Sequence, residues 1–490
     1  MTGPVTGRGE VLLAALAGAL TVAGFAPFGL FPLPLLTLAL LFRAWRRART
    51  ALASAILGYA WGLGFFLAGV SWVYVSMHDV GGMAAPLAAL ATLLFCGYLA
   101  LFPALAGWVF RRWSGAGIVF PSLLAAAAWT MAEWLRGWLF TGFPWLALGY
   151  SQAPPSPLAG FAPLLGSYGL AFLAALAAAL LGFGGRRPGP AVAVAVLFGA
   201  GFLLRGIAWS QPVGDAVSVS LLQGNIPQTL KWDPERLPLS LETYLRLTER
   251  HPARLTVLPE TALPLFFDAV PAEVRRGLTR HGDALIGVAV RSREGGYTNG
   301  AVALTPELRA SAYAKVHLVP FGEYIPPGFS WFFDLVRIPM SDFSAGPANQ
   351  APLAVAGQRL APTICYEDLF GEELLHFLPA ATLLVNLSNT AWFGDSLAQP
   401  QHLQIAQVRS AETGRPMLRA TNTGMTAAIA ADGTVAAVLP PFTVGALRVE
   451  VQGYQGTTPY MRSGNLTVLL LSASVLVGAA LRRKKPAPGD

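Results

Sequence analysis

The chain carries the sequence TICYED at residues 363–368. The apolar run that leads into it, residues 360–364, predicts a buried strand, and residues 366–378 show apolar side chains at helical spacing. A cysteine at such a strand-to-helix turn lies where a helix N-terminus stabilises negative charge and lowers the pKa of a thiol. Cys365 is therefore a candidate nucleophile, with a buried structural thiol as the alternative.

The composition around this stretch is typical of a membrane protein. Of the 490 residues, 54% are hydrophobic and only 12% are charged, and the mean hydropathy is +0.51. These values are too apolar for an ordinary soluble enzyme. Residues 211–463 carry 19 Lys and Arg against 22 Asp and Glu, so the net charge of +8 comes from the rest of the chain. The basic balance belongs to the membrane segments and does not indicate nucleic-acid binding.

Cysteine and histidine usage indicates neither a disulfide framework nor a metal centre. The chain has two cysteines, Cys96 within an apolar run and Cys365, and no Cys/His cluster with the spacing of a zinc site. His317 and His402 have no second ligand at metal spacing, so we interpret both as structural. We expect no metal and no cofactor.

Apolar segments predict a polytopic α-helical membrane protein with about eight transmembrane helices. The segments are residues 11–25, 30–42, 52–75, 84–110, 118–140, 158–183, 191–207 and 466–481. Basic clusters mark every second loop, as expected for cytoplasmic loops, which retain Lys and Arg. This pattern places both termini in the cytoplasm and the long segment before the last helix outside. Arg8, with no small-residue cleavage pattern, favours a retained first helix over a signal peptide.

The long segment between the seventh and eighth helices predicts an α/β layered domain, because short β-rich runs alternate with amphipathic stretches. Predicted strands are residues 217–222, 255–258, 284–290, 301–304, 360–364, 382–387, 425–430 and 435–439. Predicted helices are residues 234–250, 271–280, 366–378 and 400–412.

Three chemically useful residues end apolar runs in this domain. Glu260 follows LTVLP, Lys315 follows SAYA, and Cys365 follows residues 360–364. A thiol nucleophile needs a base, and a fixed cation stabilises a tetrahedral oxyanion. Glu, Lys and Cys cover these roles. Each alone is weak evidence, but three such residues at strand ends, where charges are sparse, predict an active site.

Longer strings surround these three residues. They are QGNIPQ at 223–228, KW at 231–232, PET at 259–261, KVHLVPFGE at 315–323, CYE at 365–367 and NTAWFG at 389–394. Together they resemble the carbon-nitrogen hydrolase (nitrilase) superfamily, and within it the apolipoprotein N-acyltransferase family. The resemblance covers essentially the whole chain. One departure is Asn389-Thr390, where Asn-Asp is common in the family, in a loop near the site.

The resemblance implies an α-β-β-α sandwich at residues 210–463, a seven-helix transmembrane domain at residues 1–209, and a final helix with a basic tail at residues 464–490. It also implies a bacterial cytoplasmic (inner) membrane location, with the sandwich on the periplasmic face. We expect an integral membrane protein that is a monomer.

The resemblance also implies residue roles: Glu260 as general base, Lys315 as oxyanion stabiliser and Cys365 as the acylated nucleophile. Other positions match residues that the family needs for activity; they are Glu323, Tyr366, Glu367 and Trp232. Glu323 could orient Lys315 or Glu260, and Tyr366 could offer its backbone N–H to the oxyanion. Glu367 either fixes the turn that presents Cys365 or stabilises the first turn of its helix.

Aromatic residues are candidates for contact with lipid. Trp232 and Trp392 would line an acyl groove or serve as core aromatics. Residues 329–333 (FSWFF) and 266–267 (FF) would form mobile apolar loops at a lateral opening, or pack inside the domain.

The implied activity moves an acyl chain from a membrane phospholipid, through a thioester, to the α-amino group of an N-terminal diacylglyceryl-cysteine on an apolipoprotein. A membrane-anchored amidase that uses water as acceptor stays open, since a thioester accepts either nucleophile. A transporter should carry paired ionisable residues at mid-membrane. Glu133 and Arg136 lie near one end of a span instead, as a helix-stabilising pair or a headgroup contact.

Overall fold

The computed structural model describes residues 7–228, 235, 237–292, 295–326, 328 and 342–484. Its internal contacts divide the chain into two compact units. The helical unit comprises Met1–Tyr74, Pro86–Ala208 and Arg462–Asp490. The α/β unit comprises Val75–Ala85 and Trp209–Met461.

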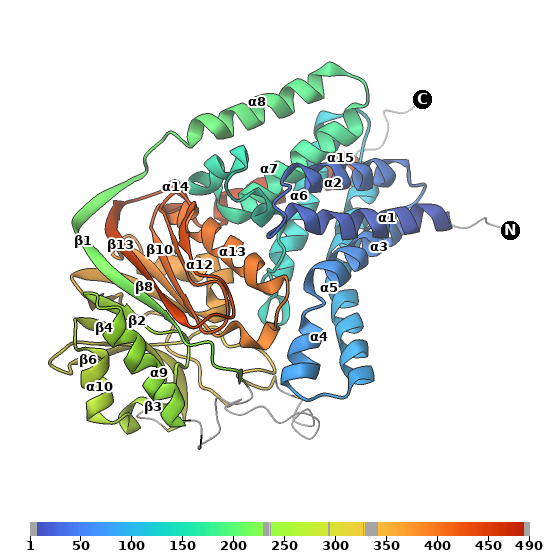
Figure 1. The fold of residues 1–490 in the computed structure, drawn as a ribbon. Coiled ribbons are helices and arrows are strands. Elements are labelled where there is room, and N and C mark those ends of the chain that lie inside the picture. The colour runs from blue at the N-terminus through green and yellow to red at the C-terminus, as the bar shows by residue number, and fades with distance from the viewer. Residues whose placement is uncertain are drawn as a thin grey trace, which may run out of the picture. The chain divides into compact units, whose positions relative to one another are not determined.

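The helical unit contains all or nearly all of each apolar segment that the hydrophobic pattern singled out, and each segment is helical over most of its length (Figure 1). Its long helices are α1 (Arg8–Thr21), α2 (Pro32–Arg47), α3 (Ala51–Val70), α5 (Ala85–Trp113), α6 (Val119–Arg136), α7 (Ala162–Gly184), α8 (Pro188–Leu204) and α15 (Leu466–Lys484). Among the described residues, three helical stretches are long and apolar enough to cross a membrane: Ala51–Val70, Ala85–Trp113 and Pro157–Gly184. The chain is therefore a membrane protein, and the count of eight spans stays a prediction.

Small residues allow the helices of this unit to approach closely. Helix α1 packs on α3, and α6 packs on both α7 and α15. A Cβ atom added to Gly18 of α1 would lie 1.9 Å from the Trp61 carbonyl oxygen, and one added to Gly64 of α3 would lie 2.0 Å from that of Ala15. Backbone contact at glycine is the usual way in which helices associate where lipid removes the hydrophobic driving force.

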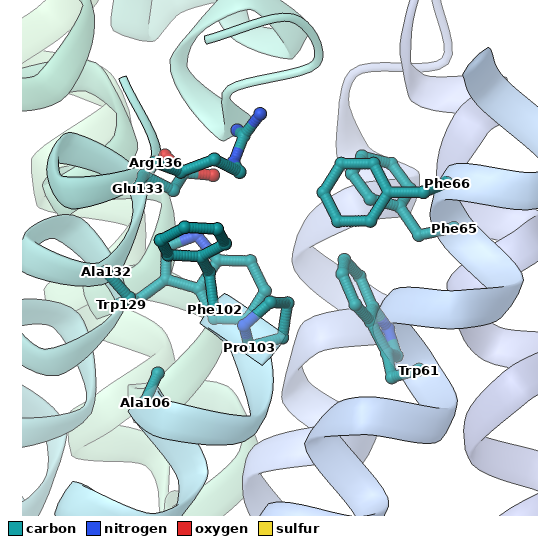
Figure 2. A pocket seen from close by; sticks show the side chains of 10 residues that line it. All are labelled: Trp61, Phe65, Phe66, Phe102, Pro103, Ala106, Trp129, Ala132, Glu133 and Arg136. Atoms are coloured by element: carbon teal, nitrogen blue, oxygen red, sulfur yellow. The ribbon is translucent and has the colours of Figure 1, made fainter. Parts of the chain in front are cut away.

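Glu133 and Arg136 lie at one end of a small cavity that is otherwise lined by apolar and aromatic side chains (Figure 2). Its volume of about 10 Å³ leaves room for about one water molecule. Both charged side chains are buried. Arg136 donates to the carbonyls of Phe143 and Trp145, and Glu133 accepts from the amide of Leu148 at 2.9 Å. The two residues thus secure the segment that follows α6, and their burial argues against a headgroup contact.

The α/β unit contains two sheets. The seven-stranded sheet has the order β13-β1-β2-β4-β5-β6, and β3 also pairs with β4. Its strands are β1 (Ser210–Gln223), β2 (Leu255–Val257), β3 (Leu263–Phe266), β4 (Asp283–Arg291), β5 (Tyr297–Leu304), β6 (Ala310–Ala314) and β13 (Gly445–Gly456). The six-stranded sheet has the order β12-β11-β10-β9-β8-β7. Its strands are β7 (Leu353–Val355), β8 (Gln358–Ile364), β9 (Leu383–Ser388), β10 (Met417–Thr421), β11 (Ala427–Ile429) and β12 (Val435–Val438).

Alternating side chains place this unit's core between the two sheets. Val219 and Leu221 of β1 pack with residues of the second sheet such as Ile364, whereas Leu222 joins a separate cluster with helix α9 (Leu237–Arg250) and helix α10 (Ala272–Leu278). Successive strand residues face opposite sides, so β1 contributes to both clusters. Helix α13 (Ala398–Thr413) contacts β10 and β11 of the other sheet (Figure 1). The layers are α-β-β-α, as predicted.

Each predicted strand coincides at least in part with an observed one, but the predicted helix at 366–378 is wrong. A 3₁₀ turn spans Cys365–Leu369, a short α-helix α12 spans Gly371–Leu374, and another 3₁₀ turn spans Leu375–Phe377. Phe370 interrupts them with φ −101° and ψ 80°. The apolar residues do recur at helical spacing, but they belong to separate short turns, and the first of these turns is buried at all five positions.

Parallel pairing brings the ends of several strands to one edge. Strand β1 pairs in parallel with β2, and β9 pairs in parallel with both β8 and β10. Cys365 follows β8, Asn389 follows β9, and Asn422 follows β10. Ligands and catalytic groups commonly lie beyond the carboxyl ends of parallel strands. The fold therefore concentrates polar groups at this edge.

Candidate active site

Cys365 occupies a tight turn directly after β8. Its φ is +53°, in the left-handed region, and its side chain is buried. A non-glycine residue in this region costs roughly 1–3 kcal/mol and persists only where its surroundings hold it. The turn that starts here has five residues and is 3₁₀ in form.

The prediction that a helix N-terminus lowers the pKa of Cys365 is wrong. Burial, together with the negative charge of Glu260, raises the pKa of the thiol, and the opposing effect of Lys315 does not offset these two causes. A continuous helix is missing from the turn, so no aligned backbone dipoles offset the burial. The resting thiol is protonated, and a base is needed to activate it.

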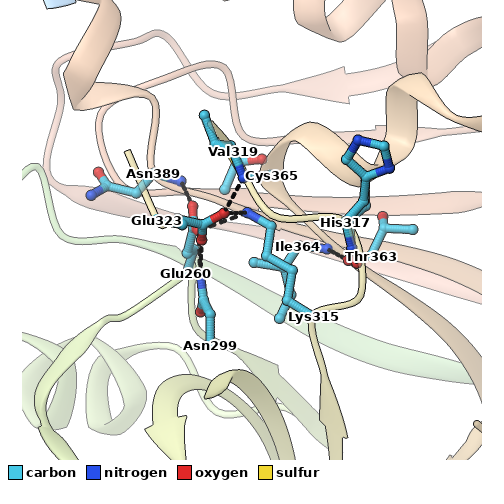
Figure 3. Close-up of polar contacts among 12 residues, drawn as sticks. Glu260, Asn299, Lys315, His317, Val319, Glu323, Thr363, Ile364, Cys365 and Asn389 are labelled. Carbon is cyan, nitrogen blue, oxygen red and sulfur yellow. Dashed lines mark hydrogen bonds and ion pairs between the residues drawn. The ribbon is translucent and has the colours of Figure 1, made fainter. Parts of the chain in front are cut away.

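The side chain of Lys315 lies beside the carboxylates of Glu260 and Glu323 (Figure 3). Its Nζ atom is 2.8 Å from Glu323 Oε2 and 3.6 Å from Glu260 Oε1. The side chain of Lys315 is completely buried, and those of Glu260 and Glu323 are largely so. Burial alone would lower the pKa of Lys315, but the nearby negative charges, chiefly those of Glu323 and Glu260, outweigh burial and raise the pKa of the lysine.

Asn299 joins the two carboxylates of this cluster. Its Nδ2 atom donates to Glu260 Oε1 at 2.7 Å and to Glu323 Oε1 at 2.8 Å. Glu323 Oε2 also accepts from the amide of Val319 at 2.8 Å. Two like charges are therefore separated by one amide and neutralised in part by one ammonium group. We name Glu260, Asn299, Lys315 and Glu323 the Lys315 cluster.

Sequence reasoning missed Asn299. Its signal was a polar residue inside a strand whose next five residues, through Leu304, are all buried, and Asn299 itself is only 2% exposed. Buried polar side chains need partners, so such a position predicts a specific hydrogen bond.

Asn389 supplies a second support for Glu260, through its backbone. Its amide donates to Glu260 Oε2 at 2.8 Å, so both carboxylate oxygens are bound. The Asn389 side chain donates to Gln228 at 2.6 Å and accepts from Asn422 at 3.0 Å. These bonds join the ends of β9 and β10 to the loop after β1. The carboxylate of Glu260 is held in one orientation.

Glu367 ties the cysteine turn to the loop that follows Lys315. Its Oε1 atom accepts from Tyr313 Oη at 2.9 Å, from the amide of Val316 at 2.7 Å and from that of His317 at 3.1 Å. Its Oε2 atom accepts from the amide of Ile364 at 2.7 Å. The side chain therefore caps the turn and also anchors it. Burial raises the pKa of Glu367 to about 7, against the opposing effects of Lys315 and these hydrogen bonds.

The remaining candidates lie around this centre. The Tyr366 ring contacts those of His317 and Phe370, with centroids 5.8 and 5.1 Å apart. His317 points away from the Lys315 cluster, and its Nδ1 atom is 2.7 Å from Glu373 (Figure 3). The carbonyl of Trp392 accepts from Ser76 Oγ at 2.8 Å. Trp392 is partly buried, which is compatible with both of its interpretations.

Two predictions about aromatic residues concern positions that lie partly or wholly outside the described residues. Trp232 and residues 329–333 lie outside them. Phe266 lies within the described residues. Its ring centroid is 5.4 Å from that of Tyr297 and 4.1 Å from the guanidinium carbon of Arg291. Phe267 packs against the cluster of α9 and α10. Both phenylalanines therefore pack on the domain and do not form a free loop.

The geometry suits acyl transfer through a thiol. The site offers a buried thiol, a fixed carboxylate that can take a proton and a fixed ammonium group that can stabilise an oxyanion. In the part of the chain that the structure describes, no group of three or more His, Cys, Asp or Glu side chains could hold a metal ion.

Family comparisons cover both parts of the chain. Residues 17–180 match the family described as apolipoprotein N-acyltransferase N-terminal domain, and residues 218–460 match the carbon-nitrogen hydrolase family. A related apolipoprotein N-acyltransferase of Nitrosomonas europaea is 51% identical, with 96% of this chain and 97% of that protein aligned. One from Chromobacterium violaceum is 49% identical, with 96% and 93% aligned.

Solved structures give a weaker likeness. An amidase from Nesterenkonia sp. AN1 aligns with 52% of this chain and 97% of its own at a TM-score of 0.38 and 19% identity. The full-length identity to the acyltransferases is what assigns the family. The chain belongs to the apolipoprotein N-acyltransferase family, within the carbon-nitrogen hydrolase superfamily.

Proposed function

We propose that this apolipoprotein N-acyltransferase takes an acyl chain from a membrane phospholipid, holds it as a thioester on Cys365, and passes it to the α-amino group of an N-terminal diacylglyceryl-cysteine. One observation carries the roles: a carboxylate bound through both oxygens, a buried lysine and a strained cysteine turn meet in one site. Glu260 is the base, Lys315 the oxyanion stabiliser and Cys365 the nucleophile.

The first half-reaction forms the thioester. Glu260 takes the thiol proton as sulfur attacks the ester carbonyl, so no free thiolate need accumulate at the raised pKa of Cys365. Lys315 stabilises the oxyanion of the tetrahedral intermediate. The intermediate collapses, the ester C–O bond breaks, and the leaving alkoxide receives the proton from Glu260. A lysophospholipid departs.

The second half-reaction releases the acyl chain. The α-amino group of the lipoprotein cysteine attacks the thioester carbonyl, and Glu260 takes its proton. The C–S bond then breaks, the amide forms, and the sulfur recovers a proton from Glu260. Glu323, Asn299 and Glu367 position these groups through the hydrogen bonds and the ion pair described above.

The membrane arrangement is part of the same proposal. We assign residues 1–209 and 464–490 to eight transmembrane helices and residues 210–463 to a periplasmic catalytic domain, in a monomer with both termini in the cytoplasm of a bacterial inner membrane. The helices and the basic loops support it. Both substrates have their reacting atoms near the bilayer surface, and extracting an acyl chain would cost about 0.8 kcal/mol per CH₂.

Intact mass spectrometry tests the proposal. Purified protein is incubated with phospholipid, beside Cys365→Ala and, as matched control, Cys96→Ala, which removes the other buried cysteine. We expect one acyl mass on wild type and Cys96→Ala and none on Cys365→Ala. A diacylglyceryl-cysteine peptide should then discharge the adduct as N-acyl peptide. Discharge by water at the same rate would favour the membrane-anchored amidase and overturn the proposed transfer.

A further inference from the structure

A second group of charged side chains is buried next to the cysteine turn, outside the Lys315 cluster. Asp368 belongs to the same 3₁₀ turn as Cys365. Its Oδ1 atom is 2.7 Å from His402 Nε2 on α13, and its Oδ2 atom accepts from Arg419 Nη1 on β10 at 3.1 Å. Asp368, His402 and Arg419 are each at most 1% exposed. Together with Asn386, they form what we call the Asp368 network.

Asn386 connects this network to the backbone of Cys365. Arg419 Nη1 donates to Asn386 Oδ1 at 2.8 Å, which orients the amide. The Nδ2 atom of Asn386 then donates to the Cys365 carbonyl at 3.1 Å and to Thr363 Oγ1 at 3.0 Å. The network thus holds the turn at two points, the carbonyl of Cys365 and the side chain of Asp368.

The protonation states of the network follow from the same contacts. An ionised carboxylate only accepts hydrogen bonds, so His402 Nε2 carries a proton toward Asp368. Burial and Arg419 lower the pKa of His402, while Asp368 and the Cys365 backbone oppose them. His402 is therefore a neutral donor, and Asp368 and Arg419 balance each other's charge.

Burying an ion pair costs desolvation energy, and apolar residues of similar volume often give a protein that is as stable or more stable. Folding stability alone therefore does not explain why charged residues occupy the Asp368 network. Cys365 is held at φ +53°, a conformation that its surroundings must enforce. Glu367 fixes the amide of Ile364 just before the turn, and the Asp368 network fixes the carbonyl of Cys365 itself.

We propose that Asp368, His402 and Arg419 are positioning residues that hold the Cys365 backbone so that its thiol meets Glu260 and the substrate carbonyl. This inference rests on the proposed role of Cys365 as nucleophile. The sequence indicated only a structural role for His402. On this proposal, His402 also supports catalysis, by holding Asp368 and so the turn that carries Cys365.

Three variants of the full-length protein in detergent micelles test it: Asp368→Asn, His402→Leu and His402→Gln. Glutamine keeps a donor that can reach Asp368, and leucine does not. The matched control is Glu412→Gln, since Glu412 pairs with Arg409 at 3.1 Å on the same helix and both are buried. All are made in the Cys96→Ala background, so that only Cys365 can react.

Two rates are measured beside the apparent melting temperature: single-turnover acylation by phospholipid and alkylation by iodoacetamide without lipid. Asp368→Asn and His402→Leu should lower acylation about ten- to hundredfold, the effect of a small misplacement of a reacting group. They should also change the alkylation rate. His402→Gln should restore most of both rates, and Glu412→Gln should lower only the melting temperature.

Wild-type rates in Asp368→Asn and His402→Leu would overturn the inference, as would equal losses in Glu412→Gln. Equal rates for His402→Gln and His402→Leu would overturn the part given to His402. Should wild type form no lipid thioester, the proposed function fails, and the alkylation rates alone still decide whether the network positions Cys365.

Discussion

Two buried groups of charged residues serve the same cysteine, and they differ in charge balance. The Lys315 cluster sets two carboxylates against one ammonium group, whereas the Asp368 network sets one carboxylate against one guanidinium group and a neutral imidazole. In the Lys315 cluster, one carboxylate has no cation of its own and can therefore accept a proton. In the Asp368 network, the one negative charge is neutralised by the one positive charge. On the proposed mechanism, the first group exchanges protons through Glu260, and the second only holds Cys365 in place.

Replacing Glu260, the proposed base, should reduce the rate of acyl transfer more than replacing Lys315 or Asn299. Glu260→Gln keeps an oxygen that can accept from Asn389 but cannot take a proton, so acyl transfer should fall about 10²–10⁴-fold. Single-turnover thioester formation measures this, with Glu273→Gln on the exposed side of α10 as a control for expression. A loss of less than about tenfold would remove Glu260 from the role of base.

Removing the ammonium group should have the next largest effect. Lys315→Met leaves Glu260 and Glu323 without their buried counter-charge and the oxyanion without its donor, so turnover should drop about 10²–10³-fold. The pKa of Cys365 should rise further, because Lys315 lowers it in wild type. The pH dependence of iodoacetamide alkylation reports this shift. An unchanged alkylation profile would show that Lys315 does not act on the thiol.

Asn299 tests whether the two carboxylates need their shared donor. Asn299→Leu removes one amide and leaves Glu260 and Glu323 each short of a hydrogen bond, at about 1–3 kcal/mol for the unsatisfied groups. We expect roughly tenfold slower turnover, a loss of about 1.4 kcal/mol of transition-state stabilisation, and a lower melting temperature. Thr298→Val, the neighbouring position on the same strand, is the control and should leave turnover near wild type.

The last prediction concerns folding stability and not turnover, through the protonation of Glu367. Its pKa is raised from 4.5 to about 7, so the folded protein holds a proton that the unfolded chain has already lost over this range. Stability should therefore fall as pH rises from about 4.5 to about 7, by up to ~3 kcal/mol at ~1.4 kcal/mol per pKa unit. Melting curves of wild type and Glu367→Gln between pH 4.5 and 8 measure it. The variant should show a flatter dependence, and parallel curves would contradict the shift.

The sequence alone determined the layered α/β domain and the apolar helices, and it predicted Glu260, Lys315 and Cys365 as the site residues. Each of these depends on local pattern: hydrophobic period distinguishes strand from helix, and a charged residue that ends an apolar run marks a strand end. The family strings then ordered the three residues into one site. Strand pairing alone did not fix their convergence, because β6, which precedes Lys315, pairs antiparallel with β5, and β8, which precedes Cys365, belongs to the other sheet.

Only the tertiary structure decided which other residues complete the site. Asn299 meets Glu260 39 positions away, and Arg419 meets Asp368 51 positions away, across strands of no fixed spacing. The broken helix after Cys365 and its left-handed backbone were equally hidden, since separate short turns reproduce the apolar spacing of a helix. Such features depend on which side chains the packing of the fold brings into contact. The pattern of residues along the sequence does not show which distant residues will meet.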